Sequence, residues 1–274
     1  TINIKGQLLS LDEPQVMGIL NVTPDSFYAG SRKQTEAAII DRIETILREG
    51  ASIIDVGGYS SRPDAAEVSE TEEMQRLEMA LQPLLQHYPD VVVSVDTFRS
   101  SVARQCVEKY GVAMINDISG GELDEQMFDT VAQLRVPYIM MHMRGTPQTM
   151  QQQTDYEDVT ADILKYFSQK LERLFRLGVN DVILDPGFGF SKTLIQNYEL
   201  MRHLGDFRIF GLPLLVGISR KSMIYKLLET TPEESLNGTT VLHTYALLRG
   251  ADILRVHDVR AAKEAIRIVQ QLKG

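Results

Sequence analysis

Two aspartates that close short apolar runs could do chemistry. Asp96 ends "VVVSVD" and Asp185 ends "DVILD", while Asn116 lies near the end of "AMIND". Carboxylates at such positions can bind a metal, act as acid and base, or accept hydrogen bonds from a heterocycle rich in N–H donors. An amide beside them can both donate and accept, so Asn116 could read the edge of a ring. The spacing leaves all three chemistries open.

Cationic residues follow two later runs. In "GISRKSMI" (217–224), Arg220 and Lys221 come after a strand-like run, where a helix begins. Helix N-termini bind anions through free N–H groups, and in barrels the loop after the seventh strand is a common phosphate site. In "LRVHDVR", Arg255 and His257 are two residues apart, which on a strand places both on one face. Both pairs could therefore bind one phosphate-rich substrate.

Three loops could complete a binding site. "NVTPDSFYAG" and "GGYSSRPDA" each combine proline with hydroxyl-bearing residues and glycine, and Arg62 in the second loop could bind a carboxylate. "DPGFGFSKT" carries Phe188 and Phe190, which could either wall a pocket for a flat ring or join the core. The glycines of this last loop do not have the spacing of a dinucleotide fingerprint.

The elements that must position these residues alternate along the chain. Short runs rich in valine and isoleucine predict strands at 16–21, 52–57, 91–96, 113–117, 137–142, 181–185, 213–217 and 252–256. Most of these runs are continuously apolar, as expected when both faces of a parallel sheet are covered. Apolar stripes at helical spacing predict helices at 35–50, 70–87, 157–177 and 258–272.

Eight strands, each followed by helical sequence, favour one α/β domain over residues 1–274, built as a (β/α)8 TIM barrel. A doubly wound sheet is the alternative, because periodicity does not show closure. In a barrel the active site lies at the carboxyl ends of the strands. Polar residues stand at these ends: Asn21, Asp55, Asp96, Asn116, His142, Asp185, Ser219, Arg255 and His257. Each could instead cap the following helix, but the repetition on most strands indicates a ligand site.

Composition excludes several classes of function. The net charge of −9 leaves no basic face for nucleic acid. No apolar run approaches the roughly 20 residues that span a bilayer, and the first residues are not organised like a signal peptide. Cys106 is the single cysteine, so no intrachain disulfide can form, and we expect a cytoplasmic protein with Cys106 buried in a helix.

The same motifs carry a resemblance over residues 16–259. They are, in order, "GILNVTPDSF", "IIDVGGYSSRP", "SVDT", "INDISG", "MHMRGTPQTMQ", "LDPGFGF", "LLVGISRKSMI" and "LRVHDV". In these motifs the sequence resembles the dihydropteroate synthases of the pterin-binding barrel family. The resemblance implies a transferase of folate biosynthesis, the target of sulfonamides. Such an enzyme joins p-aminobenzoate to 6-hydroxymethyl-7,8-dihydropterin pyrophosphate and forms 7,8-dihydropteroate and pyrophosphate. The resemblance also implies Mg²⁺ and a homodimer.

The resemblance further implies a role for each matching residue. The pterin site would comprise Asp96, Asn116, Asp185 and Lys221, with Asp55 and Met140 around it. The p-aminobenzoate site would comprise Ser61, Arg62, Pro63, Phe190, Ser222 and Phe27. The pyrophosphate site would comprise Asn21, Arg255 and His257, with Asn21 also near the magnesium ion. Lys221, Asp185, Arg255 and Asp96 are the residues expected to be catalytic.

The sequence also departs from the family pattern. Ser61 stands where many relatives have threonine, Tyr59 replaces a frequent glutamate, and Asp64 replaces a frequent glycine. Ala29 stands where an acidic residue often ends the first loop. These differences bear on loop closure, on the surroundings of the metal and on sulfonamide affinity.

Three other functions share parts of this pattern. A corrinoid methyltransferase that uses methyltetrahydrofolate has the same barrel but no use for Arg62, Lys221 and His257 around a pyrophosphate. A non-catalytic pterin-binding barrel would bind the pterin without releasing pyrophosphate. A phosphate-binding barrel isomerase would leave the "GFGF" loop and the pair Asp96 and Asp185 unexplained.

Overall fold

The computed structural model describes residues 1–22, 32–60 and 67–273 of the chain. Its central element is a sheet of eight parallel strands in the order β8-β7-β6-β5-β4-β3-β10-β9. The strands are β3 (Gln15–Asn21), β4 (Ile53–Gly57), β5 (Val92–Asp96), β6 (Met114–Asp117), β7 (Tyr138–Met141), β8 (Val182–Asp185), β9 (Leu215–Val216) and β10 (Ile253–Val256). A parallel bridge between Leu184 and Leu214 joins the two outer strands, which closes the sheet into a barrel. The predicted barrel is therefore confirmed.

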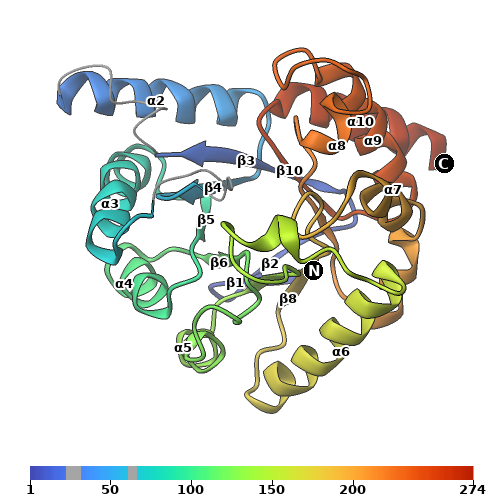
Figure 1. The fold of residues 1–274 in the computed structure, drawn as a ribbon. Coiled ribbons are helices and arrows are strands. Elements are labelled where there is room, and N and C mark those ends of the chain that lie inside the picture. Colours follow the sequence, from blue (N-terminus) through green and yellow to red (C-terminus); the bar gives the residue numbers. More distant parts are fainter. Residues whose placement is uncertain (23–31, 61–66, 274) are drawn as a thin grey trace.

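Helices surround the barrel in chain order, as Figure 1 shows. They are α2 (Arg32–Arg48), α3 (Glu70–His87), α4 (Ser100–Tyr110), α5 (Met127–Leu134), α6 (Val159–Arg176), α7 (Leu194–Arg202), α8 (Ser222–Tyr225), α9 (Leu236–Leu248) and α10 (Val259–Lys273), with 3-10 turns η1 (Met150–Gln152) and η2 (Leu204–Phe210). The helix predicted at 157–177 begins two residues later, because the Asp158 side chain caps it by accepting from Ala161 N at 2.9 Å. The strand predicted at 213–217 shortens to Leu215–Val216.

The interior of the barrel has an apolar lower layer. Each strand except β5 places a fully buried apolar side chain there: Met17, Ile53, Met114, Ile139, Ile183, Leu215 and Ile253, with the partly buried Val92 from β5. Ile2 packs onto the same cluster from an N-terminal hairpin of β1 (Ile2–Ile4) and β2 (Gln7–Leu9). The hairpin lies at the amino ends of the strands, opposite the carboxyl ends where the predicted site residues stand.

This hairpin was not predicted from the sequence. Its two strands have three residues each, and Lys5 and Gly6 form its turn with φ values of 51° and 86°. Strands this short carry too little periodicity to be recognised. The backbone amide of Asn3 donates to Asp181 Oδ1 at 2.9 Å, which ties the hairpin to the start of β8.

A second apolar core fills the space between the barrel and its helices. Outward-facing strand residues such as Leu20, Val56 and Val95 pack there against Ile43 and Leu77 from the helices. Helix α2 packs so closely against β3 that a Cβ on Gly18 would lie 2.5 Å from Ile46 Cγ2. This close packing explains why a glycine stands inside β3.

The single cysteine belongs to this outer core. Cys106 lies in α4 and is fully buried, as predicted, and burial raises the pKa of its thiol to about 12. Across the described ranges of the chain, no helix combines the length and the apolar character that crossing a membrane requires.

Candidate active site

The carboxyl ends of β4, β5, β6 and β10 bring four polar side chains into one hydrogen-bonded cluster. Arg255 Nε donates to Asp55 Oδ2 at 2.7 Å, and Arg255 Nη2 donates to Asp96 Oδ2 at 2.8 Å. Asn116 Nδ2 donates to Asp55 Oδ2 at 2.9 Å. Asp55, Asp96 and Asn116 are 0%, 8% and 3% exposed. Four strands distant in sequence therefore build one buried ionic site.

The alternation of side chains along the strands explains this placement. Asp55 follows Ile53 by two residues, and Arg255 follows Ile253 by two, so each polar side chain points into the barrel directly above an apolar one. Asn116 stands in the same relation to Met114. The lower layer excludes water, and the upper layer presents hydrogen-bonding groups to the open end.

Asp185 and Lys221 form the other half of the site. Asp185 Oδ1 accepts from the backbone amide of Gly187 at 2.8 Å. Lys221 Nζ donates to Phe188 O at 2.6 Å and lies 4.5 Å from the centre of the Phe190 ring. A Cβ placed on Gly217 would lie 3.9 Å from Lys221 Nζ and 4.0 Å from Asp185 Oδ2, so the two charged groups meet above this glycine.

Burial and mutual attraction set the charges of these groups. Burial lowers the pKa of Lys221 to about 8, against the opposing effect of Asp185. Burial raises the pKa of Asp185, whereas Lys221 lowers it. Burial also raises the pKa of Asp96, and Arg255 counteracts it. For Arg255, burial alone would lower the pKa, but Asp55 and Asp96 raise it above its ordinary value. Arg255 thus stays charged at any working pH.

Three further predicted residues lie around this cluster. Asn21 ends β3, and its Oδ1 would lie 3.4 Å from a Cβ on Gly57. Ser222 is half-buried at the first position of α8. His257 follows β10 in a bend and is exposed, with its backbone amide donating to Ser219 Oγ at 3.2 Å.

One prediction about side-chain direction needs correction, and one open alternative is resolved. Met140 is fully buried in the outer core, because Ile139 takes the inward position on β7. The next inward residue is Met141, which clusters with Phe190 and Tyr59 beside the site. Met140 is therefore not placed to contact a ligand. Likewise Phe188 is fully buried in the outer core, so of the two loop phenylalanines Phe190 alone faces Lys221.

The cationic pairs predicted from spacing also separate. Arg220 forms a bidentate ion pair with Asp258 at 2.8 and 2.9 Å, and it donates to Pro232 O at 2.9 Å. Arg220 therefore holds two loops together, while Lys221 points to the site. Arg255 turns into the carboxylate cluster rather than toward His257, because β10 ends at Val256 and His257 no longer follows the strand.

Four predicted site residues lie outside the described residues: Phe27, Ser61, Arg62 and Pro63. The departures at Ala29 and Asp64 lie outside them as well.

Sequence reasoning missed a buried lysine behind the site. Lys192 Nζ donates to Gly187 O at 2.8 Å and to Phe190 O at 2.9 Å, and lies 3.2 Å from His142 Nδ1. Burial lowers the pKa of Lys192 well below its ordinary value. Asn197 Oδ1 accepts from Gly189 N at 2.7 Å in the same loop. These contacts fix the loop that supplies Phe188 O and the Phe190 ring to Lys221. The available signal was a lysine at the end of the glycine-rich loop "DPGFGFSKT".

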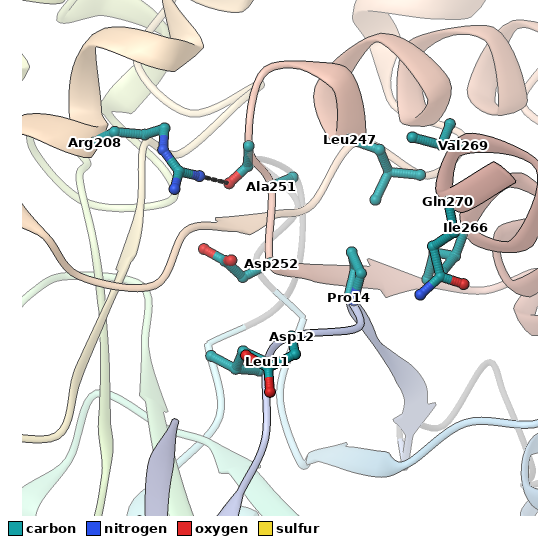
Figure 2. A pocket seen from close by; sticks show the side chains of 11 residues that line it. Leu11, Asp12, Pro14, Arg208, Leu247, Ala251, Asp252, Ile266, Val269 and Gln270 are labelled. Carbon is teal, nitrogen blue, oxygen red and sulfur yellow. Dashed lines mark hydrogen bonds between the residues drawn. The ribbon is translucent and has the colours of Figure 1, made fainter. Parts of the chain in front are cut away.

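A separate hollow of about 440 Å³ lies away from this cluster, near the amino ends of the strands. Its walls come from the segment before β3, the turn between α9 and β10, and α10 (Figure 2). Arg208 reaches over it and donates to Gly250 O at 3.3 Å, with Asp252 and Asp12 nearby. Arg208 and Asp12 are both exposed, unlike the buried carboxylates Asp55 and Asp96 at the other end.

Sequence comparisons identify the family of this chain. The family described as pterin binding enzyme matches residues 17–257. The chain is 44% identical to the dihydropteroate synthase of Escherichia coli over 97% of this chain and 94% of that protein. It is 44% identical to that of Synechocystis over 94% of this chain and 89% of that protein.

Solved structures are similar as well. A dihydropteroate synthase of Yersinia pestis in complex with a sulfonamide drug has a TM-score of 0.91 and 40% identity, covering 98% of each chain. A dihydropteroate synthase of Xanthomonas albilineans with 4-aminobenzoic acid has a TM-score of 0.90 and 36% identity, covering 100% of this chain and 98% of that one.

Proposed function

This chain belongs to the family of pterin-binding enzymes, and we propose how its residues carry out the reaction of the dihydropteroate synthases in that family. The chain is a transferase of folate biosynthesis that condenses 6-hydroxymethyl-7,8-dihydropterin pyrophosphate with p-aminobenzoate. The observation that carries the residue assignment is the buried cluster of Asp55, Asp96, Asn116 and Arg255 beside Asp185 and Lys221. We take residues 1–274 to form a single domain.

The pterin would bind against Asp96, Asn116 and Asp185. Its aminopyrimidinone edge offers several N–H donors, and ionised carboxylates accept such donors in charge-assisted hydrogen bonds. Asp55 Oδ1 is buried and has no hydrogen-bond partner among the described residues, which adds an acceptor to the same wall. Such an acceptor costs about 1–3 kcal/mol when left unpaired, so a donor-rich ligand would relieve it.

The pyrophosphate would lie toward Lys221, Arg255, His257 and Asn21. The methylene–oxygen bond breaks, its electron pair leaves with the pyrophosphate, and the amine nitrogen of p-aminobenzoate forms the new carbon–nitrogen bond and releases a proton to water. We propose that bond breaking runs ahead of bond making, since the electron-rich pterin stabilises the methylene cation. The positive charge of Lys221 stabilises the negative charge that develops on the leaving group. Asp96 and Asp185 orient the ring and do not attack it.

The p-aminobenzoate would lie near Phe190 and Ser222, with Ser61, Arg62, Pro63 and Phe27 completing its site. Phe190 presents a ring that lies 4.5 Å from Lys221 Nζ, which suits a flat aromatic substrate beside a cation. Arg62 would bind the carboxylate of p-aminobenzoate. Because a relative binds a sulfonamide drug, we propose that sulfonamides compete with p-aminobenzoate for this site.

We propose that Mg²⁺ binds at the side-chain oxygen of Asn21. Among the residues that the structure describes, no group of three histidine, cysteine or acidic side chains could hold a metal ion. Mg²⁺ usually retains several waters and takes further ligands from substrate phosphates, so one amide oxygen at Asn21 is a suitable protein ligand. When bound, the ion would neutralise charge on the departing pyrophosphate.

We further propose a homodimer in the cytoplasm. Helix α9 carries no lysine, arginine, aspartate or glutamate, yet Val241 is 60% exposed and Leu248 is 52% exposed. A helix without charged residues that exposes large apolar side chains can bury them against a second copy of the chain. Val241→Glu should therefore shift the protein from dimer to monomer in sedimentation velocity, whereas Ile195→Glu on α7, a control at a similarly exposed isoleucine, should not. If both variants were monomeric, or if both remained dimeric, α9 would not be the dimer interface.

A turnover assay with both substrates tests the reaction. Pyrophosphate release that depends on p-aminobenzoate is the expected result. Tight binding of the pterin pyrophosphate without release would indicate a binding module instead and would contradict the proposed reaction.

A further inference from the structure

Asp96 has a second partner that the proposed reaction does not use. The hydroxyl of Tyr59 donates to Asp96 Oδ1 at 2.8 Å, while Arg255 donates to Asp96 Oδ2. Tyr59 is 9% exposed and Asp96 is 8% exposed, so this hydrogen bond lies in the interior of the protein. The two donors engage both carboxylate oxygens and leave the remaining lone pairs for a ligand.

The position of Tyr59 is fixed by its surroundings. Its ring packs edge-on against Phe98, with centroids 5.2 Å apart and an interplanar angle of 77°. The preceding backbone is held as well, because Arg76 Nη1 donates to Gly58 O at 3.1 Å. A Cβ on Gly58 would lie 2.9 Å from Glu73 O, so the chain runs tightly over α3 at this point. The hydroxyl therefore faces Asp96 before any substrate arrives.

The direction of this hydrogen bond is also fixed. Burial raises the pKa of Tyr59 well above 10, so the phenol keeps its proton and acts as the donor. A hydrogen bond donated to a carboxylate favours its ionised form. Burial raises the pKa of Asp96, and the Tyr59 hydrogen bond opposes that effect together with Arg255.

We propose that Tyr59 is a positioning residue for the reaction, whose hydroxyl holds the Asp96 carboxylate in one orientation toward the N–H donors of the pterin. This inference rests on the proposed binding of the pterin at Asp96. Tyr59 itself acts through Asp96 and contributes no atom to the chemistry.

The test compares Tyr59→Phe with Tyr110→Phe by calorimetric titration with 6-hydroxymethyl-7,8-dihydropterin pyrophosphate between pH 5.5 and 8.5. Both variants lose one tyrosine hydroxyl bonded to a carboxylate, since Tyr110 donates to Glu78 Oε1 at 2.8 Å on the outside of the barrel. Tyr59→Phe keeps the ring that packs on Phe98. We expect its Kd to rise about tenfold at pH 8, in keeping with a lost hydrogen bond to a charged group, and Tyr110→Phe to bind like the unmodified protein.

The pH dependence separates positioning from a merely structural effect. Without the hydroxyl the pKa of Asp96 rises. As the solution is acidified, Tyr59→Phe should therefore begin to lose affinity for the pterin at a higher pH than the unmodified protein does. The other charged groups that face Asp96 are unchanged in the variant: Arg255, Asp55, Glu73 and Lys221. Equal Kd values for Tyr59→Phe and the unmodified protein across the range would overturn the inference. So would a loss in Tyr110→Phe as large as that in Tyr59→Phe.

Turnover is measured separately on the unmodified protein. The unmodified protein could bind the pterin pyrophosphate without releasing pyrophosphate when p-aminobenzoate is added. That result would contradict the proposed reaction, and the comparison of Kd values would still test the role of Tyr59. Circular dichroism melting of both variants identifies any loss of fold.

Discussion

The two ends of the barrel use the same residue types in different ways. At the carboxyl end, Arg255 is largely enclosed and bonded to Asp55 and Asp96, which are themselves buried. At the amino end, Arg208 is exposed beside Asp12 and donates to a backbone carbonyl (Figure 2). Both regions contain a guanidinium and carboxylates. The two ends differ in how deeply these charged groups are buried.

The difference teaches how a functional site can be recognised. Taking charges out of water costs several kcal/mol per ion, so a fold keeps them buried only where they are paired, and a cluster of such groups at strand ends is a candidate ligand site. Exposed charges carry little such cost and arise wherever a surface needs solubility. The shape of a hollow is therefore a weaker sign of function than the burial of the polar groups that line it.

The largest expected effect is on stability. Arg255→Met leaves Asp55 and Asp96 buried without their cation, which should lower the free energy of unfolding by about 3–5 kcal/mol. Urea denaturation at pH 7.5 measures this loss. A decrease below about 1 kcal/mol, the value of an exposed ion pair, would show that the cluster is solvated and would remove the contrast between the two ends.

The next effect is on turnover. Lys221→Ala removes the cation proposed to stabilise the departing pyrophosphate, and kcat should fall by about 10²–10³-fold, as when one oxyanion donor is removed. Asp185→Ala should instead raise the Kd for the pterin pyrophosphate more than it lowers kcat. Steady-state kinetics and calorimetry distinguish the two variants, and full activity in Lys221→Ala would remove that loop from the site.

The effect of pH on kcat/KM should be smaller and specific to Lys221. Because the pKa of Lys221 is lowered to about 8, its charge is present below that pH and is lost as the pH rises through it. In the unmodified protein, kcat/KM should therefore decline by about tenfold per unit above pH 8, since this ratio reports the free enzyme. Lys221→Arg keeps its charge in this range, so the decline should disappear. An identical decline in the arginine variant would assign it to another group.

The smallest effect is expected at the other end of the barrel. Arg208→Met removes an exposed guanidinium, and the free energy of unfolding should change by about 0.5 kcal/mol or less. The values of kcat/KM for both substrates should match those of the unmodified protein. A tenfold loss of kcat/KM would show that the amino-end hollow communicates with the active site.

The pattern of apolar residues within short segments predicted the strands and helices well. All eight strands and four of the helices appear close to their predicted ranges, since continuous apolar runs and apolar stripes follow from what each segment must bury. The polar residues at strand ends were also recognised. The N-terminal hairpin was missed because its stability comes from Ile2 packing under the barrel, a contact with residues far along the chain.

Side-chain direction was less predictable. The continuous run "PYIMMH" carries no alternation, so the sequence did not show that Met141 points inward and Met140 outward. The sequence also did not distinguish the adjacent cations Arg220 and Lys221. In the structure Arg220 pairs with Asp258, whereas Lys221 donates to Phe188 O.

The sequence by itself determined the strand–helix alternation, the polar strand ends and the family motifs, because each of these lies within a short segment. The tertiary structure decided which polar groups meet: Arg255 with Asp55 and Asp96, and Tyr59 with Asp96. These contacts join segments that lie far apart in the sequence and become neighbours only in the folded sheet, where β10, β3, β4 and β5 lie side by side.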